Sequence, residues 1–126
     1  MNKNGDIKEA KRIFKLAEKE YGLAKETKDE IKARQAAEKG YLALLKGVNA
    51  LFIKCGVAEE KLPKGERGRL HFLGKYADRD FRKSYNAIYK LFHIDAFHEG
   101  IINYKILDEQ FEDLEELISK VEYENV

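Results

Sequence analysis

The apolar segment at residues 33–56, ARQAAEKGYLALLKGVNALFIKCG, constrains the fold more than any other part of the chain. Its apolar side chains recur at spacings of four, three, four, three and four residues: Ala37, Tyr41, Leu44, Val48, Leu51 and Cys55. This period places them on one face of an α-helix. Further apolar residues widen that face: Leu42, Leu45, Phe52 and Ile53. A helix that is apolar on most sides must be covered on most sides, so we predict the central helix of a bundle or of a dimer.

Two glycines interrupt this predicted helix, Gly40 and Gly47. A glycine inside a helix costs about 1 kcal/mol relative to alanine, so its presence calls for a compensating contact. The spacing of seven residues puts both glycines on the same side of the helix. We therefore expect another backbone to pack closely against this side.

The composition favours long, solvated helices in one domain covering residues 1–126. Charged residues make up 37% of the chain, and proline occurs once. The one cysteine, Cys55, lies on the apolar face, where we expect it to be buried; this excludes a disulfide framework and favours a reducing compartment. We find no segment of signal-peptide composition and no run of about 20 apolar residues that could span a bilayer. These features predict a cytoplasmic protein without a membrane partner.

Charge is distributed unevenly along the chain. Residues 1–92 carry 22 Lys/Arg and 13 Asp/Glu, a balance of +9, whereas residues 93–126 carry 2 and 10, a balance of −8. Two interpretations remain open. An acidic last helix can lie beside basic earlier helices, which we favour, or two oppositely charged surfaces can recognise partners. The net charge of +1 argues against a protein that simply coats nucleic acid.

Four amphipathic helices are predicted, at about 6–26, 28–55, 68–92 and 103–123. Apolar residues keep the helical period in each of them, and no segment alternates with the period of two that a strand requires. Short connections make consecutive helices antiparallel neighbours. The predicted fold class is therefore all-α, an antiparallel up-and-down four-helix bundle.

Capping signals mark the ends of the first two helices. Asp6 with Glu9, and Thr27 with Glu30, have the three-residue spacing of a capping box. The second box restarts a helix directly after the first helix ends, so the connection between them is very short. Gly56 is expected to end the second helix in a left-handed conformation.

The second half of the chain leaves one boundary open. The third helix is either continuous or broken near 74–79, with Asp78 as a second cap. Residues 93–102 (HIDAFHEGII) are expected to form a turn or a frayed helical end around Gly100. Asn103 is then expected to cap the last helix.

Four side chains that can bind metal lie within seven residues: His93, Asp95, His98 and Glu99. Their spacing is poor for a site, because His93 and His98 are five residues apart and do not share a face of an α-helix. The inward Glu-x-x-His pairs of di-iron bundles are also absent. We therefore predict a polar turn here, with no bound metal and no cofactor.

Arg67 and His71 are four residues apart and would share a helix face. Such a pair could serve acid–base chemistry on a phosphodiester, and Arg82 and His93 are further candidates. Basic residues of the same region could instead face RNA, although acidic residues dilute the patch. These basic residues are Lys61, Lys64, Arg67, Arg69, Lys75, Arg79, Arg82 and Lys83. No glycine-rich phosphate-binding motif accompanies them, so surface neighbours are the simpler interpretation.

The segment AAEKGYLALLKGVNALF resembles the second helix of HEPN-like domains and of the archaeal PaREP family. The closing segment FHEGIINYKILDEQFEDLEELISKV resembles the polar turn and acidic last helix of the same families. The resemblance implies a four-helix bundle that is commonly dimeric. Many HEPN-like proteins are metal-independent RNases of toxin–antitoxin or defence systems, and others are non-catalytic partners of nucleotidyltransferases.

The nuclease members of the HEPN-like group carry Arg, then four to six residues, then His. In this chain the nearest pair is Arg67 and His71, with three residues between them, so the resemblance carries no catalytic residue over. We therefore predict a non-enzymatic protein that acts by association, as a homodimer or with another small protein. The alternative is a metal-independent RNase or RNA-binding protein that uses the basic region with Arg67, His71, Arg79, Arg82 or His93.

Overall fold

The structure is a computed structural model, and it describes residues 5–124, which form helices and no strand. Its α-helices are α1 (Gly5–Thr27), α2 (Glu30–Lys54), α3 (Glu66–Tyr76), α4 (Arg79–Ile88) and α5 (Tyr104–Tyr123). A short 3₁₀ turn, η1 (Glu59–Lys61), lies between α2 and α3, and a π-helical segment, η2 (Tyr89–His98), continues α4. The all-α prediction is confirmed, with five α-helices in the described residues instead of four.

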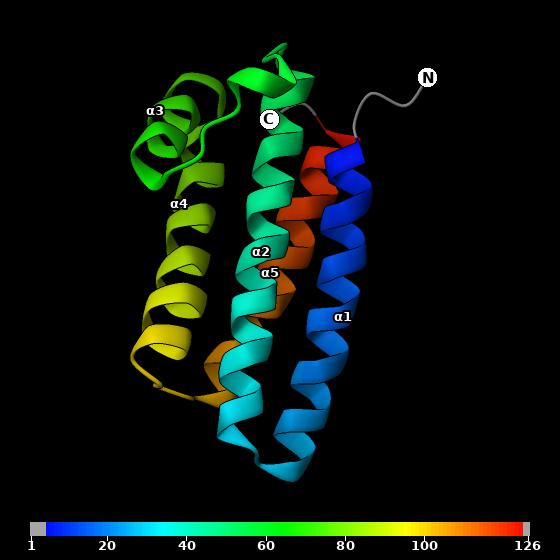
Figure 1. Ribbon diagram of the computed structural model, residues 1–126, viewed down its shortest axis with the longest axis vertical. Coiled ribbons are helices and arrows are strands. Elements are labelled where there is room, and N and C mark those ends of the chain that lie inside the picture. Colours follow the sequence, from blue (N-terminus) through cyan, green and yellow to red (C-terminus); the bar gives the residue numbers. More distant parts are fainter. Residues whose placement is uncertain (1–4, 125–126) are drawn as a thin grey trace.

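The long helices lie lengthwise beside one another, and consecutive ones run in opposite directions (Figure 1). Helix α2 contacts α1, η2 and α5, while the short α3 packs at the end of the molecule where α2 finishes. The prediction that α2 is covered on several sides is confirmed. No helix in the described part of the chain is long and apolar enough to cross a membrane.

Helix α2 buries one residue in about two, and these are mostly small or aliphatic: Ala33, Ala36, Ala37, Gly40, Tyr41, Ala43, Leu44, Gly47, Val48, Ala50, Leu51 and Phe52. Two residues of the predicted apolar face are instead exposed. Leu42 points to solvent, and Cys55 follows the last turn of α2 as its C-cap. The prediction of a buried Cys55 was wrong because the helix ends at Lys54 and the chain turns away at Gly56. Gly56 has φ of +97°, as predicted for the helix stop.

Gly40 and Gly47 face different neighbours. A Cβ on Gly40 would lie 2.7 Å from Cε2 of the buried Phe92, so the missing side chain makes room for a phenyl ring. A Cβ on Gly47 would lie 3.5 Å from Cγ1 of Ile118, an ordinary contact. The prediction of close packing therefore holds at Gly40 alone, and the neighbour is an aromatic side chain of η2, not another backbone.

The junction of α1 and α2 differs from the predicted capping box by two residues. Thr27 is the last residue of α1, and Lys28 adopts φ of +56° to reverse the chain. Asp29 is the N-cap of α2, because its Oδ1 accepts a hydrogen bond of 3.1 Å from the amide of Lys32. At the start of α1, Asp6 lies within the first turn, since the helix already includes Gly5.

The third predicted helix is broken, which was one of the two open interpretations. Helix α3 ends at Tyr76, and Asp78 caps α4 by accepting a hydrogen bond of 2.8 Å from the amide of Phe81. The side chain of Arg82 donates to the carbonyl of Ala77 at 2.6 Å, which satisfies an acceptor at the junction. The break therefore lies at residues 77–78, where α3 has ended and the Asp78 side chain caps the start of α4.

The predicted helix end at residue 92 was wrong, because residues 93–102, expected as a turn or a frayed helical end around Gly100, are helical over their first part. Segment η2 continues α4 to His98, and the amide of Glu99 bonds to the carbonyl of Ile94, five residues back, at 2.9 Å. This is the hydrogen-bond spacing of a π-helix. The turn follows at Gly100, with φ of +70°, and Asn103 caps α5 as predicted.

Helices α1 and α5 are joined by ion pairs between their opposite charges. Lys11 pairs with Glu122 at 2.9 Å, and Lys25 pairs with Asp108 at 2.6 Å. These contacts agree with the first interpretation of the uneven charge, in which the acidic last helix lies beside a basic helix of the same chain.

Candidate functional site

The π-helical winding of η2 places His93 and His98 next to each other. Their Nε2 atoms are 3.2 Å apart, although a separation of five residues does not align side chains on an α-helix. The same five-residue register joins Lys90 to Asp95, whose Nζ and Oδ2 atoms are 3.0 Å apart. The prediction that His93 and His98 do not share a helix face was therefore wrong, because it assumed the 3.6-residue period of an α-helix for a segment that is π-helical.

Glu38 of α2 orients His93. Its Oε1 lies 2.8 Å from His93 Nδ1, and both side chains are only partly exposed. When His93 is neutral, Nδ1–H donates to the carboxylate, and Nε2 is then free to accept a hydrogen bond from His98. The three side chains form a relay of carboxylate, imidazole and imidazole, drawn from two helices that are distant in sequence.

Aromatic rings hold His93 in this position. Tyr41 of α2 stacks on the imidazole with ring centroids 4.2 Å apart and an angle of 23° between the planes. Phe97 and Tyr89 lie at 6.1 and 5.7 Å from the same ring. Burial raises the pKa of Tyr41, so its hydroxyl stays protonated beside the histidine at neutral pH.

Arg34 of α2 closes the end of η2 beside the histidine pair. Its Nε and Nη2 atoms donate to the carbonyl of Phe97 at 3.2 and 2.7 Å. These bonds satisfy an acceptor that the helix end leaves open. Next to them lies a cleft of about 330 Å³, lined by Ile31, Arg34, Gln35, Phe97 and His98.

A second polar network, which the sequence did not predict, joins α3 to α4. Arg69 is only 6% exposed, and its Nη1 donates to Glu66 Oε1 at 2.7 Å. The hydroxyl of the buried Tyr85 donates to the same oxygen at 2.7 Å, and burial raises the pKa of Tyr85. The sequence placed Arg69 in a solvent-facing basic patch, whereas the fold uses it to anchor α3.

The predicted acid–base candidates do not form one site. Arg67 and His71 lie four residues apart on α3, as predicted, but both are exposed, and Arg82 bonds to the carbonyl of Ala77. His93 lies on η2, toward the other end of the long axis from α3 (Figure 1). Of these four residues, only His93 belongs to a polar cluster that is organised for proton transfer.

Of the four predicted metal candidates, only His93 and His98 come together. Asp95 is paired with Lys90, and Glu99 is exposed after the end of η2. Within residues 5–124 no group of three or more His, Cys, Asp or Glu side chains is arranged around one point. The histidine pair with Glu38 is therefore the chemically organised part of this segment.

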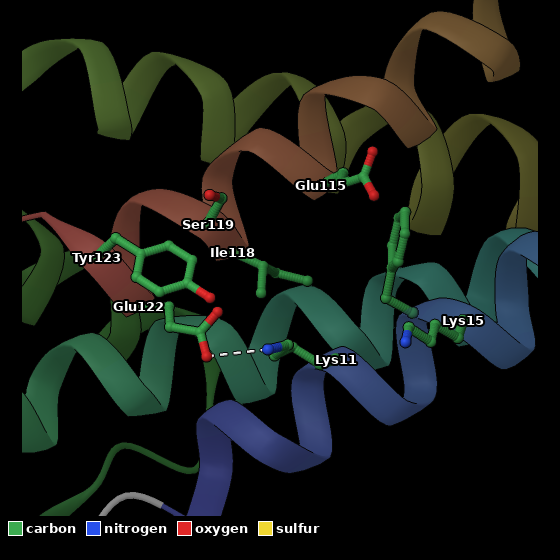
Figure 2. Close-up of a pocket in the computed structure, with 8 residues that line it drawn as sticks. Lys11, Lys15, Glu115, Ile118, Ser119, Glu122 and Tyr123 are labelled. Atoms are coloured by element: carbon green, nitrogen blue, oxygen red, sulfur yellow. Dashed lines mark hydrogen bonds and ion pairs between the residues drawn. The ribbon is translucent and has the colours of Figure 1, made fainter.

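Another cleft, of about 320 Å³, lies between α1 and α5 (Figure 2). Phe14 and Ile118 supply its apolar floor, and the side chains of Lys11 and Glu122 point toward each other across it. The remaining lining residues are Lys15, Glu115, Ser119 and Tyr123. None of the lining residues is a histidine or a cysteine, so this cleft has less capacity for acid–base chemistry than the histidine pair.

Comparison with known protein families gives a match that covers most of the chain. Residues 12–120 match the archaeal PaREP1/PaREP8 family, a range that includes α2, η2 and both histidines of the pair. No curated protein and no solved structure matches the chain. Because the family match covers far more than half of the 126 residues, the chain belongs to the archaeal PaREP1/PaREP8 family.

Proposed function

We propose that this protein acts by association with a second copy of itself, as a non-enzymatic cytoplasmic homodimer with a HEPN-like four-helix arrangement. The observation that carries the proposal is a row of exposed apolar side chains along the outer side of the α1–α2 hairpin. Leu16 is 43% exposed, Leu23 54%, Ile31 69% and Leu42 45%. We refer to these four residues, with Glu20 and Lys39 among them, as the outer hairpin face.

The residues of this face share one side of the hairpin. Leu16, Glu20 and Leu23 are spaced by four and three on α1. On α2 the spacing is four, four and three, from Ile31 through Gln35 and Lys39 to Leu42. An ion pair between Glu20 and Lys39 joins the two rows. Beside this pair lies a cleft lined by Glu20, Leu23, Lys32 and Gln35. The two helices are antiparallel, so Leu16 and Leu42 both lie on the same side of the ion pair.

The exposed surface is narrower than the sequence predicted. Most apolar side chains of α2 are covered within the chain by α1, η2 and α5, which leaves Ile31 and Leu42 as its exposed large apolar residues. The apolar surface available to a partner is therefore shared between α1 and α2. An exposed patch of this kind is typical of protein–protein contact sites.

A second copy fits this face because the face carries both charge signs around an apolar row. A twofold axis places the same surface against itself, so Glu20 and Lys39 of one copy can meet the opposite charges of the other. A standard interface buries about 800 Å² per partner. That is about one tenth of the accessible surface of this chain, 7643 Å².

The order of the helices also supports the proposal. Helices α1, α2, α4 with η2, and α5 form four long segments that alternate in direction. This is the order expected of a HEPN-like bundle, a group whose members are commonly dimeric. In our proposal the exposed Cys55 remains a reduced thiol, as expected in the cytoplasm.

Two matched substitutions test the proposal. Leu42→Glu places a charge on the outer hairpin face, whereas Leu70→Glu places one on α3 at a side chain of almost equal exposure, 46% against 45%. We expect Leu42→Glu to yield monomers in size-exclusion chromatography with light scattering, because a buried unpaired carboxylate is costly. Leu70→Glu should remain dimeric. If both variants keep the oligomeric state of the wild type, the outer hairpin face is not the interface.

RNA cleavage without metal is a second candidate function, favoured by one observation. Glu38 orients His93, and His98 lies within hydrogen-bonding distance of it, which is an arrangement suited to general acid–base catalysis. Incubation of the pure protein with RNA in the presence of EDTA tests this candidate. Cleavage that is lost in His93→Gln and kept in His71→Ala would support it, and intact RNA with the wild-type protein would contradict it.

A further inference from the structure

We infer that His93 and His98 form a two-histidine binding site for a divalent first-row transition metal ion, with Glu38 supporting the site from behind. The site goes beyond the proposed association, and it does not depend on it. It rests on three features of the described residues, namely the separation of the two nitrogens, the carboxylate behind one ring and the access from solvent.

The two imidazole nitrogens are spaced as ligands of one ion would be. Zinc–nitrogen bonds of about 2.0–2.1 Å at the tetrahedral angle put two ligand nitrogens about 3.3–3.4 Å apart. The Nε2 atoms of His93 and His98 are 3.2 Å apart. Their ring centroids are separated by only 4.4 Å with the planes at 75°, so one ring meets the other edge to face. An ion can replace the hydrogen bond between the rings when the exposed imidazole of His98 turns its Nε2 lone pair toward the point that His93 Nε2 faces.

Glu38 supplies the support that metal-binding histidines commonly have. A carboxylate bonded to the far nitrogen of a ligating imidazole fixes its tautomer and makes the near nitrogen a better electron donor. Glu38 Oε1 lies 2.8 Å from His93 Nδ1, which directs Nε2 toward His98. Tyr41 stacks on the same imidazole and restricts its rotation.

The site is open to solvent at His98, beside the cleft between α2 and η2. His98 is exposed and lines the cleft beside Arg34, whose guanidinium is engaged with the carbonyl of Phe97. Since the described residues hold no third ligand, water or an added ligand would fill the other coordination positions. Imidazole nitrogens suit Zn²⁺, Ni²⁺ and Cu²⁺, whereas Mg²⁺ and Ca²⁺ require oxygen ligands.

Isothermal titration calorimetry on untagged, EDTA-treated protein tests the inference, with ZnCl₂ and NiCl₂ as ligands and MgCl₂ as the comparison. We expect saturable binding of one Zn²⁺ or Ni²⁺ per chain, and no heat of binding with Mg²⁺. His98→Ala removes an exposed side chain and should abolish saturable binding. His71→Ala removes an exposed histidine outside the site and should bind as the wild type does.

Glu38→Gln tests the supporting role of Glu38 while leaving both metal-binding histidines in place. It should weaken the affinity by about 10–100-fold, as loss of an outer hydrogen-bond partner typically does. Acidification should also weaken binding in the wild type, because protons compete for the same nitrogens. Absence of saturable binding in the wild type, or unchanged binding in His98→Ala, would overturn the inference. Unchanged metal binding by the Leu42→Glu variant would show that the site is independent of association.

Discussion

Among single residues, Asp108 on α5 accepts hydrogen bonds from two side chains of α1. Tyr21 Oη lies 2.6 Å from its Oδ1, and Lys25 Nζ lies 2.6 Å from its Oδ2. Burial alone would raise the pKa of Asp108, but the hydrogen bonds from Lys25 and Tyr21 outweigh it and lower the pKa below its usual value of 3.8. A lowered pKa in the folded state stabilises the fold above pH 3.8, and that contribution is lost as the pH falls through the folded-state pKa.

Tyr21→Phe removes one of the two donors to Asp108 and leaves the ring in place. We expect the free energy of unfolding to fall by about 0.5–1.5 kcal/mol at pH 7, the usual contribution of one hydrogen bond. The difference from the wild type should be smaller at pH 3 than at pH 7, because it shrinks as the pH falls toward and through the folded-state pKa of Asp108. Urea unfolding at both pH values measures this, with Tyr123→Phe as the control on an exposed ring. An equal difference at pH 7 and pH 3 would contradict the assigned role of Asp108.

Among the elements, α2 contains two glycines, Gly40 and Gly47, whose effect on stability depends on the side chains packed against them. Gly40 faces the buried Phe92, and Gly47 faces Ile118 at an ordinary distance. Alanine gains about 1 kcal/mol over glycine in a helix, so the sign of each substitution depends on the space available for one methyl group.

We predict opposite signs for Gly40→Ala and Gly47→Ala. The first places a methyl group 2.7 Å from a ring carbon of Phe92 and should destabilise the fold by about 1–3 kcal/mol, the usual cost of overpacking a core. The second should raise the free energy of unfolding by up to about 1 kcal/mol. Urea unfolding of both variants gives the values. A stabilising Gly40→Ala would contradict the close contact of Gly40 with Phe92, and a destabilising Gly47→Ala would contradict the space described beside Gly47.

The break between α3 and α4 depends on the side chain of Asp78. Asp78→Ala removes the N-cap bond to the amide of Phe81 and should cost about 0.5–2 kcal/mol of stability. Asp80→Ala, in the first turn of the same helix but outside the cap position, is the matched control and should cost less. Thermal unfolding followed by circular dichroism compares the two. A larger loss for Asp80→Ala would argue that α4 does not begin at this cap.

The sequence predicted the elements that obey an α-helical period and missed those that do not. The apolar period predicted α2, Gly56 predicted the helix stop, and Asn103 predicted the N-cap of α5. These predictions were correct because each depends on residues close together in the sequence. Segment η2 was missed because its turns are wider than the assumed 3.6 residues. For the same reason the five-residue spacing of His93 and His98 concealed their contact, and Glu38, 55 residues away, gave no local signal. Arg69 was misplaced because nothing near it in sequence reveals the buried Tyr85.

At the scale of the whole molecule, the chain covers its central helix by itself. Helices α1, α5 and η2 surround α2, and the charges that divide the sequence into basic and acidic parts meet between α1 and α5. The apolar residues left outside this arrangement include the row on one side of the hairpin: Leu16, Leu23, Ile31 and Leu42. The proposed function therefore depends on whether that row is covered by a second copy.

The mass of the wild-type protein in solution tests this claim most directly. Multi-angle light scattering over a wide range of concentrations should give a mass approaching twice that of the 14.6 kDa chain as the concentration rises. A mass that stays at 14.6 kDa up to the highest concentration would contradict self-association through the outer hairpin face.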